Sequence, residues 1–175
     1  MRDSAALIDA IAFAAHKHRG QLRKDAEKTP YINHPIALVR VLLVEARVTD
    51  EKTLLGAVLH DTLEDTETTF DELRERFGRK VAELVVEVSD DKSLLAEERK
   101  ALQIEHAPHL SKRAKLVKLA DKICNLRDVV AHPPHDWPLT RRRKYFDWAK
   151  AVVDGLRGVD RRLESLFDTA YAARP

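Results

Sequence analysis

The chain of 175 residues is long enough for one domain with its own hydrophobic core, but it is short for two domains joined by a linker. Its 31 basic and 29 acidic residues nearly cancel, so bulk charge indicates neither a nucleic-acid partner nor a membrane surface. Cys124 is the single cysteine, which excludes an intrachain disulfide and any multi-cysteine metal site and favours a reducing, cytoplasmic setting.

Helices are expected to carry the fold, because five glycines and seven prolines are few for the many turns of an all-β domain. Apolar residues recur at helical spacing after Ser4, which we expect to cap a first helix that ends before Gly20. Asp3 and Asp9 interrupt the apolar run that a signal peptide would need. No apolar stretch approaches the roughly 18 residues of a membrane span, so we expect neither an exported nor a membrane-spanning protein.

The chain from 21 to 33 is polar and is expected to form a loop that leads into a second helix. Pro35 suits the first turn of that helix, where its missing N–H costs no hydrogen bond. Thr49 is expected to cap a third helix, whose apolar side ends near His60 and Asp61.

Turn and cap signals divide the rest of the chain into further helices. Thr69 and Glu72 form a capping box for a short helix that Gly78 ends, and Ser111 opens a long helix. The remaining helices are expected at 81–88, 94–106, 111–131, 140–156 and 159–172. Together these segments predict an all-α bundle of about eight or nine helices, which forms a single domain over residues 1–175.

The dipeptide His60-Asp61 is a candidate for chemistry, although the composition makes one His-Asp pair by chance unsurprising. A second pair at 135–136 lies among prolines and is most simply a surface turn. His60-Asp61 differs because Glu64 and Asp65 follow four residues later, on neighbouring faces if the helix continues for one turn. A charged helix end is the alternative explanation, but four titratable groups directly after a buried run are unusual in a core.

Asp121 lies at the border of the apolar face of the helix over 111–131, and Cys124 lies within that face as a core residue. The opposite side of this helix carries Lys115, Lys118 and Lys122. A half-buried carboxylate must be paired, hydrogen-bonded or bound to a metal, so Asp121 is a candidate ligand. An internal salt bridge to Arg127, or to another helix, is the alternative.

Two imidazoles and two carboxylates from three predicted helices form a candidate metal site: His34, His60, Asp61 and Asp121. A mixed nitrogen and oxygen set suits a borderline divalent ion such as Mn²⁺, Fe²⁺ or Zn²⁺ better than Ca²⁺, which prefers oxygen alone. Four protein ligands leave positions open on a six-coordinate ion, so such a site would bind water and substrate.

These residues resemble the HD-domain phosphohydrolases, and more narrowly the alarmone-hydrolase domain of the Rel/SpoT family. The resemblance rests on His34, on the run His-Asp-Thr-Leu-Glu-Asp at 60–65, and on Asp121 within Lys-Leu-Ala-Asp-Lys. The segments 21–24, 30–35 and 125–128 are similar to the parts of that family that contact the nucleotide. The similarity runs almost end to end and is closest to the small stand-alone hydrolases of the metazoan SpoT homologue type.

The resemblance implies that Mn²⁺ is held by His34, His60, Asp61 and Asp121. It implies that Glu64 and Asp65 activate a water molecule, that Arg23 and Lys24 lie along a nucleotide, and that Tyr31, Asn125 and Arg127 shape its pocket. Asp128 departs from the long bifunctional Rel enzymes, which tend to carry a small hydroxyl residue there. The synthetase and regulatory domains of those enzymes need several hundred more residues, so we expect a hydrolase alone.

The implied reaction removes the 3′-diphosphate of guanosine tetraphosphate or pentaphosphate (ppGpp or pppGpp), which yields GDP or GTP and pyrophosphate. One alternative is a phosphatase of another phosphorylated nucleotide, such as the 2′-phosphate of NADPH. The other alternative is a helical module that senses a nucleotide without hydrolysing it. All three imply a small nucleotide as the partner, with no nucleic acid and no membrane.

Overall fold

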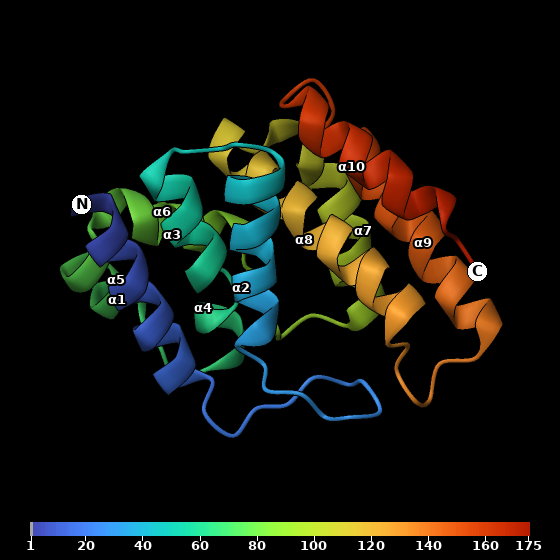
Figure 1. Cartoon of the computed structure of the whole chain (residues 1–175), viewed down its shortest axis with the longest axis horizontal. Coiled ribbons are helices and arrows are strands. Elements are labelled where there is room, and N and C mark those ends of the chain that lie inside the picture. Colours follow the sequence, from blue (N-terminus) through green and yellow to red (C-terminus); the bar gives the residue numbers. More distant parts are fainter. Residues whose placement is uncertain (1) are drawn as a thin grey trace.

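The computed structural model describes residues 2–175 and confirms the all-α class (Figure 1). Within this range the only extended pairing is an isolated bridge between Leu22 and Pro30. The helices are α1 (Arg2–Lys17), α2 (Asn33–Val39), the π-helix η1 (Arg40–Glu45), α3 (Glu51–Leu59), α4 (Thr62–Asp65), α5 (Phe70–Phe77), α6 (Arg79–Val88), α7 (Ala96–His106), the 3₁₀-helix η2 (Ala107–His109), α8 (Lys112–Ala131), α9 (Leu139–Asp154) and α10 (Arg161–Ala172).

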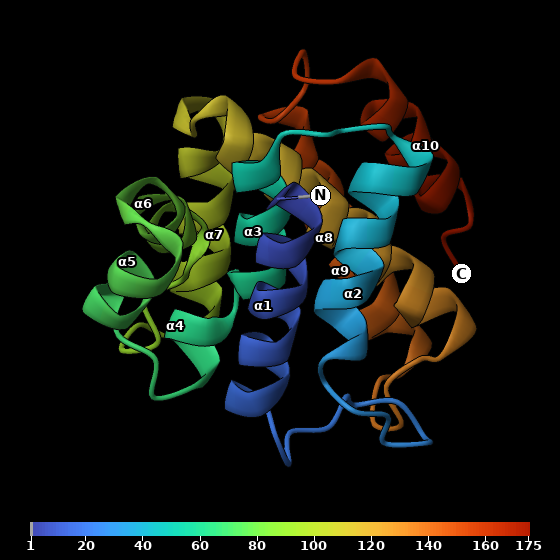
Figure 2. The ribbon, with the colours of Figure 1, turned by 60° about the vertical axis from the view of Figure 1, so that its left-hand side comes forward.

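The central elements are α3 and α8, which pack against each other. Helices α1, α2 and α6 also contact α3, while α2, α6, α9 and α10 contact α8. Figure 1 shows α1, α5 and α6 at one end of the molecule and α9 with α10 at the other, and Figure 2 shows α1 and α3 close together. This arrangement places the ends of α2 and α3 beside the middle of α8.

Close packing of α3 against α6 depends on Gly56. A Cβ atom at this position would overlap the Leu84 side chain, so the approach of the two helices requires a residue without one. Fully buried Leu59 and Leu119 belong to the same core, and Cys124 is also buried, as its position on the apolar face of α8 predicted.

Most predicted helix ends agree with the structure to within about two residues, which is the usual uncertainty. Thr69 and Ser111 cap α5 and α8 through their hydroxyl oxygens, as predicted. The prediction for Ser4 is wrong, because α1 is already helical from Arg2. The second helix continues beyond α2 as the π-helix η1, which apolar spacing alone did not indicate.

The cap of α3 is Asp50 rather than Thr49. The Asp50 carboxylate accepts hydrogen bonds from the Thr53 backbone N–H at 3.0 Å and from its hydroxyl at 2.8 Å. The same carboxylate pairs with Arg113 on α8, with N···O distances of 2.8 and 3.0 Å. A carboxylate can accept all of these bonds at once, whereas a single threonine hydroxyl cannot.

We expect Asp50→Ala to lower the free energy of unfolding by about 1 kcal/mol, the usual cost of losing an N-cap. For a chain of this size this corresponds to a fall in Tm of about 2–4 °C, measured by circular dichroism. The hydrogen bonds from Arg113 hold the pKa of Asp50 well below its usual range. The difference between the two proteins is therefore largest at neutral pH and shrinks as the pH falls below about 4, where the carboxyl of the unfolded chain is protonated. Thr49→Ala is the control, and an equal loss there would contradict the assignment of the cap.

Helix α8 is more enclosed than the sequence predicted. Lys122 was expected on an exposed side, but only 3% of it is accessible to solvent. Its ammonium group lies 4.5 Å from the centre of the Trp148 ring on α9 and 3.0 Å from an Asp121 oxygen. The reason is that α9 and α10 cover parts of α8 that its own sequence marks as polar.

Across the described residues, no helix is both long enough and apolar enough to cross a membrane.

Candidate metal centre and adjoining cavities

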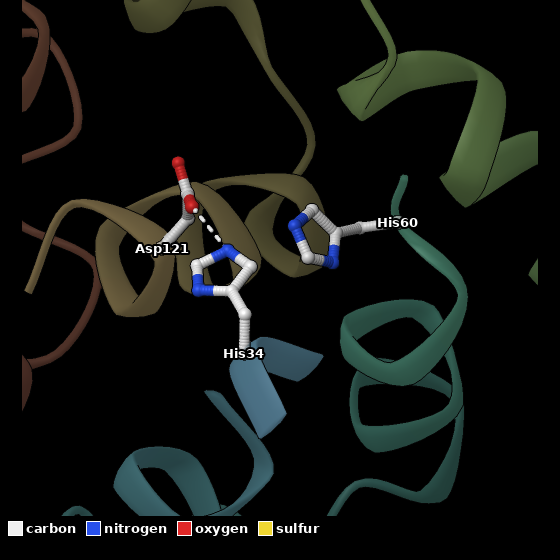
Figure 3. A group of neighbouring side chains, drawn as sticks. All are labelled: His34, His60 and Asp121. Atoms are coloured by element: carbon white, nitrogen blue, oxygen red, sulfur yellow. Dashed lines mark ion pairs between the residues drawn. The ribbon is translucent and has the colours of Figure 1, made fainter. Parts of the chain in front are cut away.

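Three helices bring His34, His60 and Asp121 together. His34 lies in the first turn of α2, His60 directly follows α3, and Asp121 lies in the middle of α8. One donor atom from each residue lies within 4.8 Å of the others, and Figure 3 shows the three side chains pointing toward one another. Both histidines are buried. The packing of α2, α3 and α8 therefore creates a compact group of nitrogen and oxygen donors.

The hydrogen bonds of His60 leave one of its ring nitrogens free. Nδ1 lies 2.9 Å from the Ala57 carbonyl oxygen, to which it donates in the neutral ring. Nε2 lies 2.9 Å from an Asp61 carboxylate oxygen, but it is buried and makes no hydrogen bond of good geometry. Burial would lower the pKa of His60, but the Asp61 carboxylate raises it to about 9. A proton and a metal cation would compete for the same Nε2 position.

His34 faces the carboxylate of Asp121. Its Nε2 lies 3.2 Å from an Asp121 oxygen, and burial lowers the pKa of His34 despite this neighbour. Asp121 also contacts the Lys122 ammonium at 3.0 Å and accepts a hydrogen bond from the Asn125 amide at 2.6 Å. The alternative of a salt bridge between Asp121 and Arg127 is wrong, because Arg127 pairs with Glu45 at 2.9 and 3.0 Å.

Asp61 lies beside this group rather than within it. Its carboxylate contacts His60 and accepts a hydrogen bond from the Tyr31 hydroxyl. Burial and the adjacent Asp61 raise the pKa of Tyr31, so its hydroxyl stays protonated and can donate this hydrogen bond. Burial would raise the pKa of Asp61, but the neighbouring His60 lowers it below its usual value. The structure thus brings three of the four predicted ligands together and places the fourth in contact with one of them.

The donor set fits a divalent cation. The buried Nε2 of His60 has no hydrogen-bond partner, which is costly for a polar atom unless another group binds there. Carboxylate oxygens next to imidazole nitrogens are the usual ligands of borderline divalent metals. His34, His60 and Asp121 are therefore a candidate His/Asp metal site, and the Asp61 carboxylate contacts His60 beside it.

Glu64 and Asp65 lie on α4, one helical turn after the His60-Asp61 pair. Glu64 accepts a hydrogen bond from the Asp90 backbone N–H at 3.1 Å, and burial raises the pKa of its carboxyl group. The Lys92 ammonium contacts the Asp65 carboxylate and lies 3.5 Å from Glu64. Both acids therefore face the same space as the metal group without belonging to it.

A cavity of about 200 Å³ contains this group and is lined by both histidines, Asp61, Glu64, Asp65 and Asp121. A larger cavity of about 700 Å³ adjoins it and shares Arg23, Tyr31, His34, Asp65 and Asn125. Lys24 also lines the larger cavity. Four of the five residues predicted to contact a nucleotide therefore surround one space.

Arg127 is the exception among these predicted residues. It does not line either cavity, and its guanidinium group is paired with Glu45 on η1. Asp128 lies on the cavity side instead and accepts a hydrogen bond from Arg23 at 2.6 Å. Asp128 thus holds Arg23 in place.

Two aromatic residues of the large cavity were not predicted from the sequence. Trp137 directly follows the pair at 135–136 that was predicted as a surface turn, and Tyr145 lies on α9. Both line the cavity, and their ring centres lie 5.3 Å apart. An aromatic residue in a loop bounded by prolines has no helix face to pack on. That signal could have marked Trp137 as a binding residue.

Comparisons with known proteins identify the family of the chain. A family model of the HD domain matches residues 10–146. A Xenopus tropicalis protein named guanosine-3′,5′-bis(diphosphate) 3′-pyrophosphohydrolase MESH1 is 54% identical, over 97% of this chain and 94% of that protein. The Homo sapiens protein of the same name is 53% identical, over 98% of this chain and 96% of its own.

A solved structure, described as a metazoan ortholog of SpoT that hydrolyses ppGpp, superposes with a TM-score of 0.94. The two chains are 50% identical, and the match covers 97% of this chain and 96% of the other. The resemblance drawn from the motifs is thereby confirmed. The chain belongs to the HD-domain family and, within it, to the group of the MESH1 proteins.

Proposed function

We propose that this protein is a Mn²⁺-dependent hydrolase that removes the 3′-diphosphate of guanosine tetraphosphate or pentaphosphate. The observation that carries the proposal is the position of the buried His34, His60 and Asp121 group at the edge of a cavity of about 700 Å³. That cavity is lined by Arg23 and Lys24 and is large enough for a nucleotide. The names of the MESH1 relatives support the choice of guanosine bis(diphosphate) as the substrate.

His34, His60, Asp61 and Asp121 would hold the Mn²⁺ ion. When bound, this ion supplies Lewis-acid polarisation of a phosphoryl oxygen and lowers the pKa of water. The Ala57 carbonyl oxygen orients the His60 ring through its contact with Nδ1, and Tyr31 fixes Asp61 by donating a hydrogen bond to its carboxylate. This buried arrangement leaves little freedom for the donor atoms to move.

The proposed reaction breaks the bond between the 3′-oxygen and the proximal phosphorus. A water oxygen forms a bond to that phosphorus, and Glu64 accepts the proton that the water loses. The electron pair of the broken bond goes to the 3′-oxygen, which takes up a proton and becomes a hydroxyl group. The products are GDP or GTP and pyrophosphate. Burial favours a protonated Glu64, so proton uptake during the step is less costly than for an exposed carboxylate.

Arg23 and Lys24 would bind the charged substrate. Arg23 is half-buried and is held by Asp128 at 2.6 Å and by Asn125 at 3.4 Å, so its position is fixed before the nucleotide arrives. We expect Arg23→Ala and Lys24→Ala chiefly to raise KM, because a contact made equally in the ground and transition states leaves kcat unchanged. Steady-state kinetics checks this. Arg19→Ala is the control, because Arg19 is exposed and does not line the cavity, and unchanged KM in both loop variants would contradict the role of the loop.

Product analysis tests the proposed function directly. Purified protein with Mn²⁺ is incubated with ppGpp, pppGpp and NADPH, and the released phosphates are separated by ion-exchange chromatography. We expect one pyrophosphate for each GDP or GTP formed. Release of orthophosphate from NADPH, with ppGpp intact, would establish the phosphatase alternative. Tight binding without turnover of any of the three would establish the sensing module.

A further inference from the structure

A third cavity, of about 210 Å³, shares no lining residue with the nucleotide cavity. Its walls come from the end of α6, the loop 89–95, α7, α8, Leu110 after η2, and Val152 on α9. Asp90, Gln103 and Lys118 line both this cavity and the cavity around the metal group, so the two spaces adjoin. The group of His34, His60 and Asp121 therefore lies between a large cavity and a small one.

Two cations in the small cavity lack close partners. The Arg99 guanidinium lies 3.7 Å from Glu64, and its Nε atom is buried without a hydrogen bond. The Lys118 side chain is 13% exposed, and its ammonium group lies 3.6 Å from Asp90. Both distances exceed those of a hydrogen bond. Half-buried cations with such loose contacts favour an additional anion.

The acidic residues of the same cavity are better satisfied. Glu87 accepts hydrogen bonds from the Ser111 backbone N–H and hydroxyl, and Asp91 accepts the equivalent pair from Ser93. Asp90 accepts a hydrogen bond from the Gln103 amide at 2.6 Å. The groups with unused hydrogen-bonding capacity are thus Arg99, Lys118 and the Gln103 carbonyl oxygen, which is buried without a donor.

We infer that Arg99 and Lys118 bind the distal phosphoryl group of the leaving diphosphate and so select 3′-diphosphates over 3′-monophosphates. The inference rests on the proposed function. At the reacting phosphorus, the 3′-oxygen and the attacking water take opposite positions, and the bridging oxygen to the distal phosphorus takes a third. The nucleoside fills the large cavity, so the distal phosphoryl group needs a separate space. The small cavity offers it, since 210 Å³ is several times the roughly 30 Å³ that one water occupies in the liquid.

The test compares two substrates that differ only in the distal phosphoryl group: guanosine 5′-diphosphate carrying either a 3′-diphosphate or a 3′-monophosphate. The measured quantity is the ratio of kcat/KM for the diphosphate to kcat/KM for the monophosphate. We expect Arg99→Gln and Lys118→Met each to lower this ratio by about 10- to 100-fold, the loss typical of one hydrogen bond to a charged group. Any effect of Arg99 on Glu64 acts on both substrates and cancels in the ratio.

Calorimetry without added metal gives a second measurement that does not depend on turnover. The affinity for the diphosphate is expected to fall in both variants, while that for the monophosphate stays the same. Lys100→Gln is the matched control, because Lys100 follows Arg99 on α7 but pairs with Glu97 at 3.2 Å, away from the cavity. Circular dichroism confirms that each variant is folded, and Lys118→Met keeps the length of the buried stem.

The outcomes separate this inference from the proposed function. If the wild-type protein hydrolyses the diphosphate and both variants keep the wild-type ratio and affinities, the inference is wrong and the proposed function stands. If the wild-type protein hydrolyses neither substrate, the proposed function fails and the inference fails with it. A lowered ratio in both variants, with the control unchanged, supports the distal-phosphate site.

Discussion

Replacing Glu64 by glutamine is expected to lower kcat by about 100- to 10,000-fold, the usual contribution of a general base. The substitution keeps the shape of the side chain and its ability to accept the hydrogen bond from the Asp90 backbone, but it removes the proton acceptor. Because Glu64 lies outside the group formed by His34, His60 and Asp121, the metal content and the substrate affinity should stay near wild type. Stopped assays with ppGpp measure kcat, and elemental analysis measures the metal.

The pH dependence gives an independent check on the same residue. Burial raises the pKa of Glu64, so in the wild-type protein the rate should rise with pH over a range above the 4.5 of an ordinary glutamate. This acid limb should disappear in Glu64→Gln. Glu67→Gln is the control, since Glu67 is exposed at the end of the same segment. A variant at position 64 that keeps more than about half of the wild-type rate would exclude the role of general base.

Replacing His60 by alanine is expected to abolish stoichiometric metal binding and, with it, almost all activity. The Nε2 of His60 is the metal-binding nitrogen that makes no hydrogen bond within the protein, so no neighbouring atom takes its place as a ligand. The loss of metal affinity should exceed the roughly 10- to 100-fold that accompanies removal of a group behind a ligand. Elemental analysis after dialysis against Mn²⁺ measures the content directly.

The second His-Asp pair of the chain supplies a matched control. His135→Ala removes an exposed histidine with the same neighbour in sequence, and its metal content and activity should equal those of the wild type. Full metal occupancy in His60→Ala, together with a folded circular dichroism spectrum, would remove His60 from the proposed ligands. Equal metal loss in both variants would show that the metal binds histidines without regard to this site.

Local signals predicted the helices and marked His60 and Asp121 as candidates, but no local signal places these two residues next to His34. Apolar spacing identifies which side of a helix is buried, and a carboxylate at the border of that side, such as Asp121, has few possible surroundings. A helix surface alone does not show which of its polar residues another helix covers. Lys122 was therefore predicted as exposed, although Trp148 of α9 lies over it.

Arg127 is a second residue whose contacts depend on a neighbouring helix that its own sequence does not reveal. Its motif suggested a nucleotide contact, but its partner, Glu45, lies on η1 and is distant in sequence. The π-helical turn that places Glu45 there has no signal in the apolar spacing. The small cavity beside Arg99 was also not predictable from the sequence, because it is formed by several segments whose relative positions follow only from packing.

The metal-binding atoms come from α2, α8 and the end of α3, so metal binding is coupled to folding. These segments are far apart along the chain, so the unfolded protein offers no preformed place for a cation, and only the assembled core does. A ligand that binds the native state alone stabilises it by about 2.7 kcal/mol when its concentration is 100 times its Kd. The availability of the ion in the surroundings would then set how many molecules stay folded as well as how many are active. A cell short of the metal would then hold a larger unfolded fraction of the protein, open to proteolysis, in addition to a lower turnover.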